Sequence, residues 1–225
     1  MVHTDWTYTD TDKYLGIKGG KAGSSHGHMD AGSFVYDAYG VRWSMDFGLQ
    51  SYTTLESVLA GLGGNLWDMG QNSMRWDVFR LNNLNHSTIS INDARHRVNG
   101  AATLTTTINT ATEFGATLDL TEVVSDQDLV VMDEIKARTD KSAKVRWCMV
   151  TPAVPTVESN RIVLTNGSKV MYLTASGSVK PTYKQWSTTS ENSYDQANPG
   201  TYMVGFEATV TANQTATFTT TLSPK

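Results

Sequence analysis

Several features that are common in proteins are scarce or absent in this 225-residue sequence. Cys148 is the only cysteine, so an internal disulfide bond is excluded, and its apolar neighbours favour a buried structural thiol. The 18 lysines and arginines form no basic stripe, which argues against a general nucleic-acid-binding protein. No apolar run is long enough to cross a bilayer, and the N-terminus lacks the basic and apolar segments of a secretory signal peptide. What remains is a globular chain with a formal charge of −4.

Short runs of β-forming residues, separated by turn sequences such as Asn166-Gly167-Ser168, are abundant, above all after His86. The expected strands cover residues 14–18, 33–39, 41–46, 87–91, 103–108, 116–124, 129–137, 143–151, 161–165, 169–175, 182–187, 202–210 and 216–222. A helix is predicted near residues 53–62, where Leu55 and Leu59 fall at helical spacing before two glycines. We therefore expect residues 1–225 to form one all-β domain, an antiparallel β-sandwich with one short helix.

A pair of histidines in a glycine-rich stretch organises the N-terminal part of the chain. His26 and His28 are two residues apart, so in an extended strand both imidazoles would point to one face. A hairpin over residues 33–46 would bring Asp46 back toward His28, and His86 precedes the next strand. Two imidazoles and a carboxylate can fill three positions of a zinc shell, which would leave one histidine free for proton transfer. Asp30 either begins a turn or orients an imidazole.

Residues 64–85 have little periodicity and are expected to form a long loop. Trp67 and Trp76 in it, and Tyr52 before it, could stack on sugar rings or belong to the core. The arginines of this region, Arg75 and Arg80, could meet an acidic substrate or be solvated or salt-bridged. His96 is expected at the surface.

The run from Lys18-Gly19-Gly20 through His26-Gly27-His28-Met29-Asp30 to Phe34 resembles the C-terminal domain of the heparinase II/III-like polysaccharide lyases. Gly40, Asp46-Phe47-Gly48 and Tyr52 extend the resemblance, as do Phe79-Arg80, His86-Ser87-Thr88-Ile89-Ser90-Ile91, 128–138 and Trp147. Ser87 departs from the family, which commonly has asparagine there, and Ser25 from relatives with a polar amide there.

The resemblance implies a supersandwich-like β-sandwich that follows an N-terminal α/α toroid, with the active site between the two domains. By matching positions, His28, Asp46 and His86 would bind a zinc ion that organises the site, and His26 would be the catalytic histidine. The implied reaction is β-elimination on a polysaccharide that contains uronic acid, for which Arg80, Lys18 and Tyr52 are the expected substrate contacts.

The resemblance also implies a periplasmic or secreted parent protein whose toroid supplies a catalytic tyrosine and the groups that neutralise the uronate. Because this sequence contains no all-α segment, we expect the chain by itself to have little or no lyase activity.

Two other interpretations remain open. Cupin-like metalloenzymes also carry His-x-His on a β-strand, but no glutamate follows His28 before Glu56 and His86 lacks a Pro-x-Gly context. In a non-catalytic carbohydrate-binding module, exposed tryptophans would bind the glycan and the histidines would be incidental.

Overall fold

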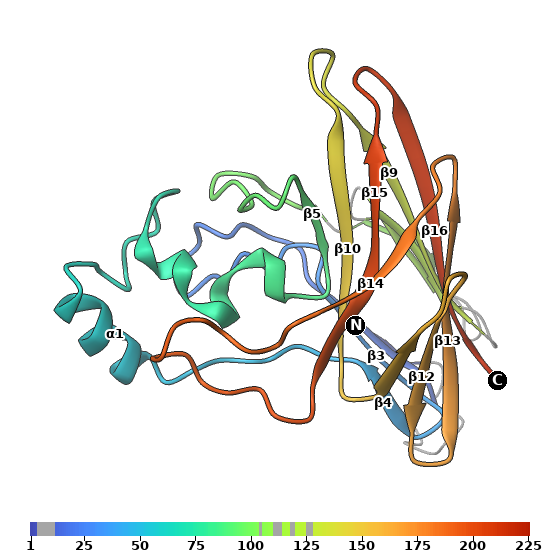
Figure 1. The fold of residues 1–225 in the computed structure, drawn as a ribbon, viewed down its shortest axis with the longest axis horizontal. Coiled ribbons are helices and arrows are strands. Elements are labelled where there is room, and N and C mark those ends of the chain that lie inside the picture. Colours follow the sequence, from blue (N-terminus) through green and yellow to red (C-terminus); the bar gives the residue numbers. More distant parts are fainter. Residues whose placement is uncertain (4–11, 104, 110–113, 118–119, 125–127) are drawn as a thin grey trace.

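The computed structural model describes residues 1–3, 12–103, 105–109, 114–117, 120–124 and 128–225. Within these residues the regular structure is mostly antiparallel β-sheet, arranged in three sheets, and α1 (Tyr52–Gly61) is the only α-helix. Figure 1 shows the sheets at one end of the molecule, with α1 and the loops around it at the other end.

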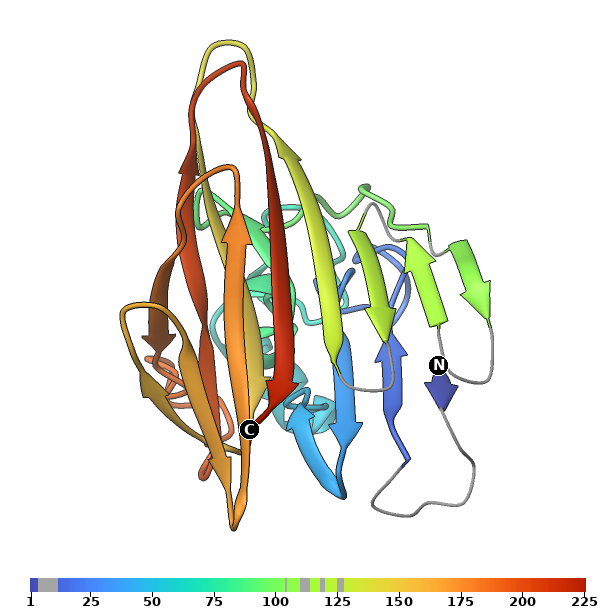
Figure 2. The same ribbon diagram turned by 90° about the vertical axis from the view of Figure 1, so that its right-hand side faces the viewer.

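The largest sheet has eight strands in the order β11-β12-β13-β16-β9-β8-β7-β6 and faces the viewer in Figure 2. Its strands are β6 (Thr105–Asn109), β7 (Phe114–Thr117), β8 (Leu120–Val124), β9 (Leu129–Lys136), β11 (Val154–Val157), β12 (Ile162–Asn166), β13 (Lys169–Gly177) and β16 (Thr215–Pro224). Within it, β16 pairs along its length with β13 on one side and β9 on the other, so the last strand in sequence lies inside the sheet.

Two four-stranded sheets lie against the large one, in the orders β1-β2-β3-β4 and β14-β15-β10-β5. Their strands are β1 (Val2–His3), β2 (Tyr14–Ile17), β3 (Phe34–Ala38), β4 (Val41–Ser44), β5 (Ile89–Ile91), β10 (Ala143–Thr151), β14 (Thr182–Trp186) and β15 (Tyr202–Val210). A bridge between Met45 and Val150 joins the two small sheets at the ends of β4 and β10.

The main core fills the space between the layers, because alternate residues along each strand point inward. Trp147 of β10 stacks on Phe206 of β15, and Phe206 in turn contacts Phe218 of β16 across the sandwich. Strand β10 is buried on both faces, since Cys148 and Val150 on its other side are covered by a second cluster that includes Phe79. The prediction of a buried Cys148 is thus confirmed.

The loop-rich end has an apolar cluster of its own, formed by α1 and residues from the flanking loops. Leu55 and Leu59, one turn apart on α1, are fully buried against Leu66 and Trp76. The helix stops before Gly63, whose φ of +81° is the left-handed conformation that glycine adopts most easily after a helix.

Most of the expected elements are present, and the fold class is confirmed. The helix and the hairpin of β3 and β4 lie where the sequence predicts them. The expected strand over 116–124 instead contains the end of β7 and all of β8, with residues 118–119 outside the described part of the chain. Strands β1 and β11 were not expected. The stretch 64–85 contains three short 3₁₀ helices, η1 (Met74–Asp77), η2 (Phe79–Leu81) and η3 (Asn83–Asn85).

Candidate functional site

The segment that carries His26 and His28 is a turn, so the expected extended strand is wrong. Backbone bonds from Ser24 N to Lys21 O (3.3 Å) and from Gly27 N to Ser24 O (2.8 Å) fold it tightly. A Cβ on Gly27 would lie 2.5 Å from the carbonyl oxygen of Ala22, which explains why glycine occupies this position. His26 has a φ of +60°, a conformation that costs about 1–3 kcal/mol for a non-glycine residue and is retained when the surroundings impose it.

As a result, the two histidines enter different surroundings. The imidazole of His26 is exposed and lies between two aromatic rings of the loop-rich end. It stacks on Tyr52 at a centroid distance of 5.8 Å and meets Trp67 edge-on at 5.1 Å. Trp67 is held by a 2.9 Å hydrogen bond from its indole Nε1 to Glu56 on α1. His26 is therefore the histidine that a large ligand can reach.

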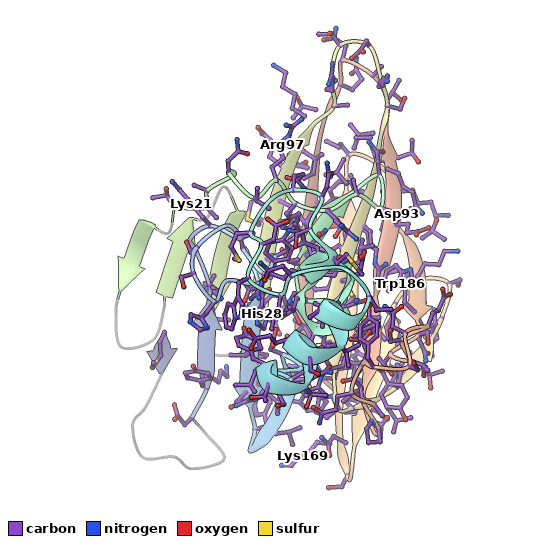
Figure 3. All side chains as sticks on the ribbon, turned by 90° about the vertical axis from the view of Figure 1, so that its left-hand side faces the viewer. Lys21, His28, Asp93, Arg97, Lys169 and Trp186 are labelled. Atoms are coloured by element: carbon purple, nitrogen blue, oxygen red, sulfur yellow. The ribbon has the colours of Figure 1, made fainter. Side chains whose placement is uncertain are left out.

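His28 points instead toward His86, with 5.7 Å between the ring centroids. His86 is fully buried, and its Nδ1 lies 2.7 Å from Oδ2 of Asp46. The other oxygen of Asp46 accepts a 2.7 Å hydrogen bond from Gly48 N. The three predicted ligands thus lie next to one another, and Figure 3 shows the labelled His28 near α1.

Asp30 belongs to this group as well. Ligand atoms of His28, Asp30 and His86 lie within 4.8 Å of one another, so Asp30 lies beside the imidazoles, as one of its two expected roles requires. Asp30 also accepts a 2.6 Å bond from Lys18 Nζ, and its backbone oxygen begins a turn by accepting from Ser33 N. The turn interpretation of Asp30 is confirmed, and its carboxylate is a second acidic group near the two imidazoles.

Burial and mutual proximity set the charge states of the site. Burial, followed by the repulsion of the neighbouring His86, lowers the pKa of His28 to about 4, so that its imidazole is neutral at pH 7. Burial raises the pKa of Asp46, but its hydrogen bond with His86 and the charge of His86 outweigh that effect and leave the pKa below its ordinary value. A neutral imidazole at His28 and an ionised carboxylate at Asp46 are the protonation states in which these groups can bind a divalent metal.

A zinc ion fits this donor set. Nε2 of His86 is buried and has no hydrogen-bond partner among the described residues, although buried polar atoms are almost always paired. Oxygen and imidazole nitrogen are both ordinary zinc ligands. The orphaned nitrogen and the 4.8 Å grouping support a metal here, but that grouping contains His28, Asp30 and His86, whereas Asp46 is bonded to the other ring nitrogen of His86, Nδ1.

Ser87, which departs from the family pattern, holds the segment just before Asp46 in place. Its hydroxyl donates to Met45 O and accepts from Val150 N, both at 3.0 Å, in a buried position. The same side chain therefore ties the residue before Asp46 to β10. The serine that follows His86 thus has a structural role.

Among the predicted substrate contacts, Tyr52 lies in the site, Lys18 at its edge and Arg80 behind it. The hydroxyl of Tyr52 is 3.3 Å from Nε2 of His28. Lys18 is half-exposed and paired with Asp30. Arg80 is buried, and its guanidinium donates to Leu49 O at 3.0 Å and to the side chain of Asn198 at 2.7 Å. These bonds tie the η2 segment to the loop at 187–201. Nothing in the structure tests the expected role of Arg80 in substrate binding, which stays a prediction.

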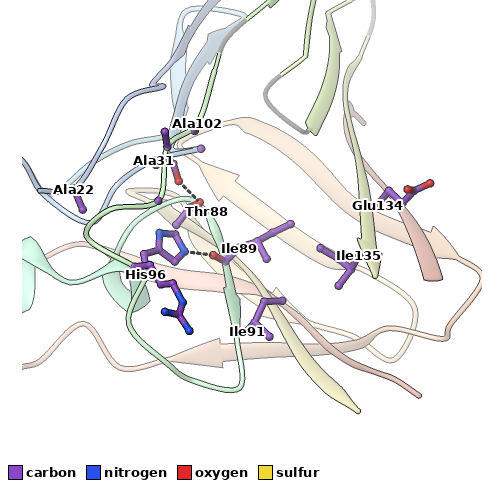
Figure 4. Close-up of a pocket in the computed structure, with 13 residues that line it drawn as sticks. Ala22, Ala31, Thr88, Ile89, Ile91, His96, Ala102, Glu134 and Ile135 are labelled. Carbon is purple, nitrogen blue, oxygen red and sulfur yellow. Dashed lines mark hydrogen bonds between the residues drawn. The ribbon is translucent and has the colours of Figure 1, made fainter. Parts of the chain in front are cut away.

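The pocket drawn in Figure 4, of about 370 Å³, is lined mainly by apolar side chains. His96 lines it and donates from Nε2 to Ile89 O at 2.8 Å, so the expectation that His96 is a free surface residue is wrong. Burial lowers the pKa of His96, which keeps this donor neutral. None of the predicted site residues lines this pocket.

The fold and the site define a β-sandwich domain with a histidine- and aspartate-rich centre at its loop-rich end. The chain belongs to the heparinase II/III-like C-terminal family, whose sequence profile matches residues 5–224. A search of curated protein sequences finds no significant match. In the part of the chain that the structure describes, no helix is long and apolar enough to span a membrane.

Solved structures share the fold at low sequence identity. A crystal structure of heparinase III superposes with a TM-score of 0.67 at 16% identity and covers 99% of this chain. A mutant of the heparan sulfate lyase HepC from Pedobacter heparinus gives a TM-score of 0.65 at 15% identity, and the heparinase III BT4657 gene product gives 0.60 at 12%. This chain spans about a third of the length of those proteins, 34–35%.

Proposed function

We propose that this chain is the β-sandwich part of a polysaccharide lyase that cleaves glycans containing uronic acid by β-elimination. The observation that carries the proposal is that the two histidines of the turn lie in different surroundings. His26 is exposed between two aromatic rings, whereas His28, two residues later, faces the buried His86 and Asp46. One histidine is thus available to a substrate, while its neighbour is committed to the site's framework.

The chemistry asks for three things of the protein. The C5 proton of a uronic acid is weakly acidic while the carboxylate is ionised, so that charge must be neutralised. A base must then reach C5, and an acid must protonate the departing 4-linked oxygen. We assign His26 to one of these proton transfers, because it is the exposed histidine of the turn and histidine is the side chain that most often serves as a general acid or base.

His28, Asp46 and His86 would hold a zinc ion, which when bound fixes the relative positions of the turn, the β3–β4 hairpin and the segment before β5. Asp30 stands beside both imidazoles and pairs with Lys18. These residues would therefore hold the turn that carries His26 in a fixed position, as contacts around the ligands of other metal sites fix the orientation of those ligands.

The other catalytic groups would come from a helical domain of the same parent protein, acting on an acidic polysaccharide outside the cytoplasm. This part of the proposal follows from the family and from the share of the solved relatives that the chain covers. Tyr52 and Lys18 are the substrate contacts that we carry forward, since both border the site.

The test combines glycan binding with a lyase assay on the purified chain. With zinc present, binding of a uronic-acid polymer should weaken in His26→Ala and on chelation. The chain alone should form no unsaturated uronate above the His26→Ala control, because the helical domain is missing from it. Product formation by the chain alone would contradict the assignment of groups to that domain.

A carbohydrate-binding module is the second candidate, and the exposure of Trp67 favours it. The ring is 40% exposed at the face that carries His26. Glycan binding that is unaffected by chelation and by His26→Ala, but lost in Trp67→Ala, would support the module and overturn the lyase assignment.

A further inference from the structure

Arg75, in η1, is an arginine that the sequence placed among possible substrate contacts or solvated residues, and it is neither. Its side chain is completely buried. It lies under the histidine turn, between the rings of Tyr52 and Trp76, each of which has its centroid 5.4 Å from the guanidinium carbon. A buried guanidinium is costly to desolvate, so a site that keeps one must offset that cost through specific contacts.

Those contacts reach both sides of the histidine turn. Nη1 donates to Leu66 O at 2.9 Å, which fixes the loop after α1. Nη2 donates to Gly27 O at 2.8 Å, the carbonyl of the peptide between the two histidines. Nη2 also lies 3.3 Å from the hydroxyl of Tyr52. One planar group thus contacts three segments that are far apart in the sequence.

The hydroxyl of Tyr52 extends the reach of Arg75 to both histidines. A guanidinium only donates, so the Tyr52 oxygen accepts from it and keeps its own proton for another partner. That oxygen lies 3.3 Å from His28 Nε2 and 3.5 Å from the backbone oxygen of His26. Arg75 therefore touches the motif directly at Gly27 and indirectly at each flanking histidine.

The turn needs such an anchor because its backbone is strained. His26 has a φ of +60°, and a residue in that conformation persists only where the surroundings over-determine it. The bond from Arg75 to Gly27 O fixes the orientation of the peptide that immediately follows His26. A lysine could not replace it, because an ammonium group lacks the planar fork that reaches two carbonyls and a hydroxyl at once.

We propose that Arg75 is a positioning residue of the site: it holds the Gly27 peptide and the Tyr52 hydroxyl, and thereby sets the relative placement of His26 and His28. The inference deepens the proposed function and rests on it for the role of the two histidines. Arg75 touches neither the glycan nor the metal in this assignment, and acts through its contacts.

The test uses the purified chain with Arg75→Lys, which keeps the charge, and Arg75→Met, which keeps the aliphatic stem. Both should weaken zinc affinity by about 10- to 100-fold, the range for loss of contacts that orient metal ligands. The visible spectrum of the Co²⁺-substituted chain should shift in both, since it reports ligand geometry. Amide resonances of residues 26–28 should also move in Arg75→Lys.

Leu59→Ala is the matched structural control. Leu59 is fully buried in the same apolar cluster beneath the turn, but no hydrogen bond connects its side chain to the motif. It should lower the melting temperature, while zinc affinity at a temperature where the protein is folded and the Co²⁺ spectrum stay at wild-type values. Wild-type zinc affinity and spectrum in folded Arg75→Lys would overturn the proposal.

Tyr52→Phe keeps the proposal testable if both Arg75 variants fail to fold. It removes the hydroxyl but leaves the bond from Arg75 to Gly27, and should weaken zinc affinity by less than tenfold; an unchanged affinity would contradict the indirect contact. If the wild-type chain binds no zinc, the metal assignment of the proposed function fails. The amide shifts at residues 26–28 in the Arg75 or Tyr52 variants then decide whether the anchoring of the turn is correct.

Discussion

The two ends of this molecule are held together in different ways. In the strands from β9 to β16, buried side chains are mostly apolar and pack between sheets, as the stacked rings of Trp147 and Phe206 do. At the loop-rich end, fully buried polar side chains are frequent, and Arg75 and His86 are both completely inaccessible. An apolar core tolerates volume-conserving substitutions, whereas a fully hydrogen-bonded polar network rigidifies its members and specifies one arrangement. The sandwich therefore provides most of the stability of the fold, and the hydrogen bonds of the loop-rich end fix the positions of the site residues.

The largest effect should come from the apolar half. Phe206→Ala removes a fully buried ring that contacts Trp147 and Phe218, and should lower the free energy of unfolding by about 3–5 kcal/mol. Chemical denaturation measures this loss. The folded fraction should still bind zinc with unchanged affinity. A parallel loss of zinc affinity would contradict the view that the sandwich core and the zinc site are independent of each other.

The second prediction concerns a buried acid within the sandwich. Burial raises the pKa of Asp133 to about 7, and neither of its carboxyl oxygens has a hydrogen-bond partner among the described residues. In the folded state Asp133 therefore keeps a proton that the unfolded chain has lost, so stability should fall as the pH rises from about 4 to about 7 and then level off. Asp133→Asn should remove this slope in denaturation curves measured across that range. A slope that survives the substitution would assign it to another group.

The third prediction separates the two carboxylates beside the imidazoles. Asp46→Asn should weaken zinc affinity by more than the roughly 10- to 100-fold typical of a lost orienting contact, because Asp46 is the proposed ligand and is bonded to His86. Asp30→Asn should have a smaller effect, since Asp30 is already paired with Lys18. Titration with zinc and a competing chelator measures both. The reverse order would make Asp30 the ligating carboxylate, with Asp46 orienting His86 from behind.

The smallest effect is expected at the exposed aromatic face. Trp67→Ala should weaken binding of an acidic glycan by only a few-fold, because Trp67 offers one partly exposed ring at the edge of the site. Zinc affinity should not change. Complete loss of glycan binding in this variant, with His26→Ala unaffected, would instead point to the carbohydrate-binding module.

The sequence predicted those parts of the site that depend on local pattern. The alternation of residues 33–46 indicated the hairpin that returns Asp46, and the hydrophobic spacing of α1 indicated the helix that carries Tyr52. His28 and Asp46 both lie next to His86, but the ligand atoms that group within 4.8 Å are those of His28, Asp30 and His86, so the assignment of Asp46 as a ligand stays a prediction.

The conformation of the histidine turn could not be predicted in this way. Spacing suggested a strand, but the left-handed backbone of His26 depends on a close approach of Ala22 to Gly27 and on Arg75, which lies 48 residues further along the chain. The 3₁₀ helices around Arg75 likewise begin with side-chain caps from Ser73 and Asn82 that have no periodic signature. Long-range hydrogen bonds, and not propensity, determine this end of the molecule.

The most direct test of the account is the zinc content of the purified chain, measured by elemental analysis for wild type and His28→Ala after equilibration with zinc and removal of the excess. The account predicts close to one bound zinc per wild-type chain and a loss of that zinc in His28→Ala. Absence of zinc from both proteins, or equal zinc in both, would contradict the assignment of His28, Asp46 and His86 as a metal site.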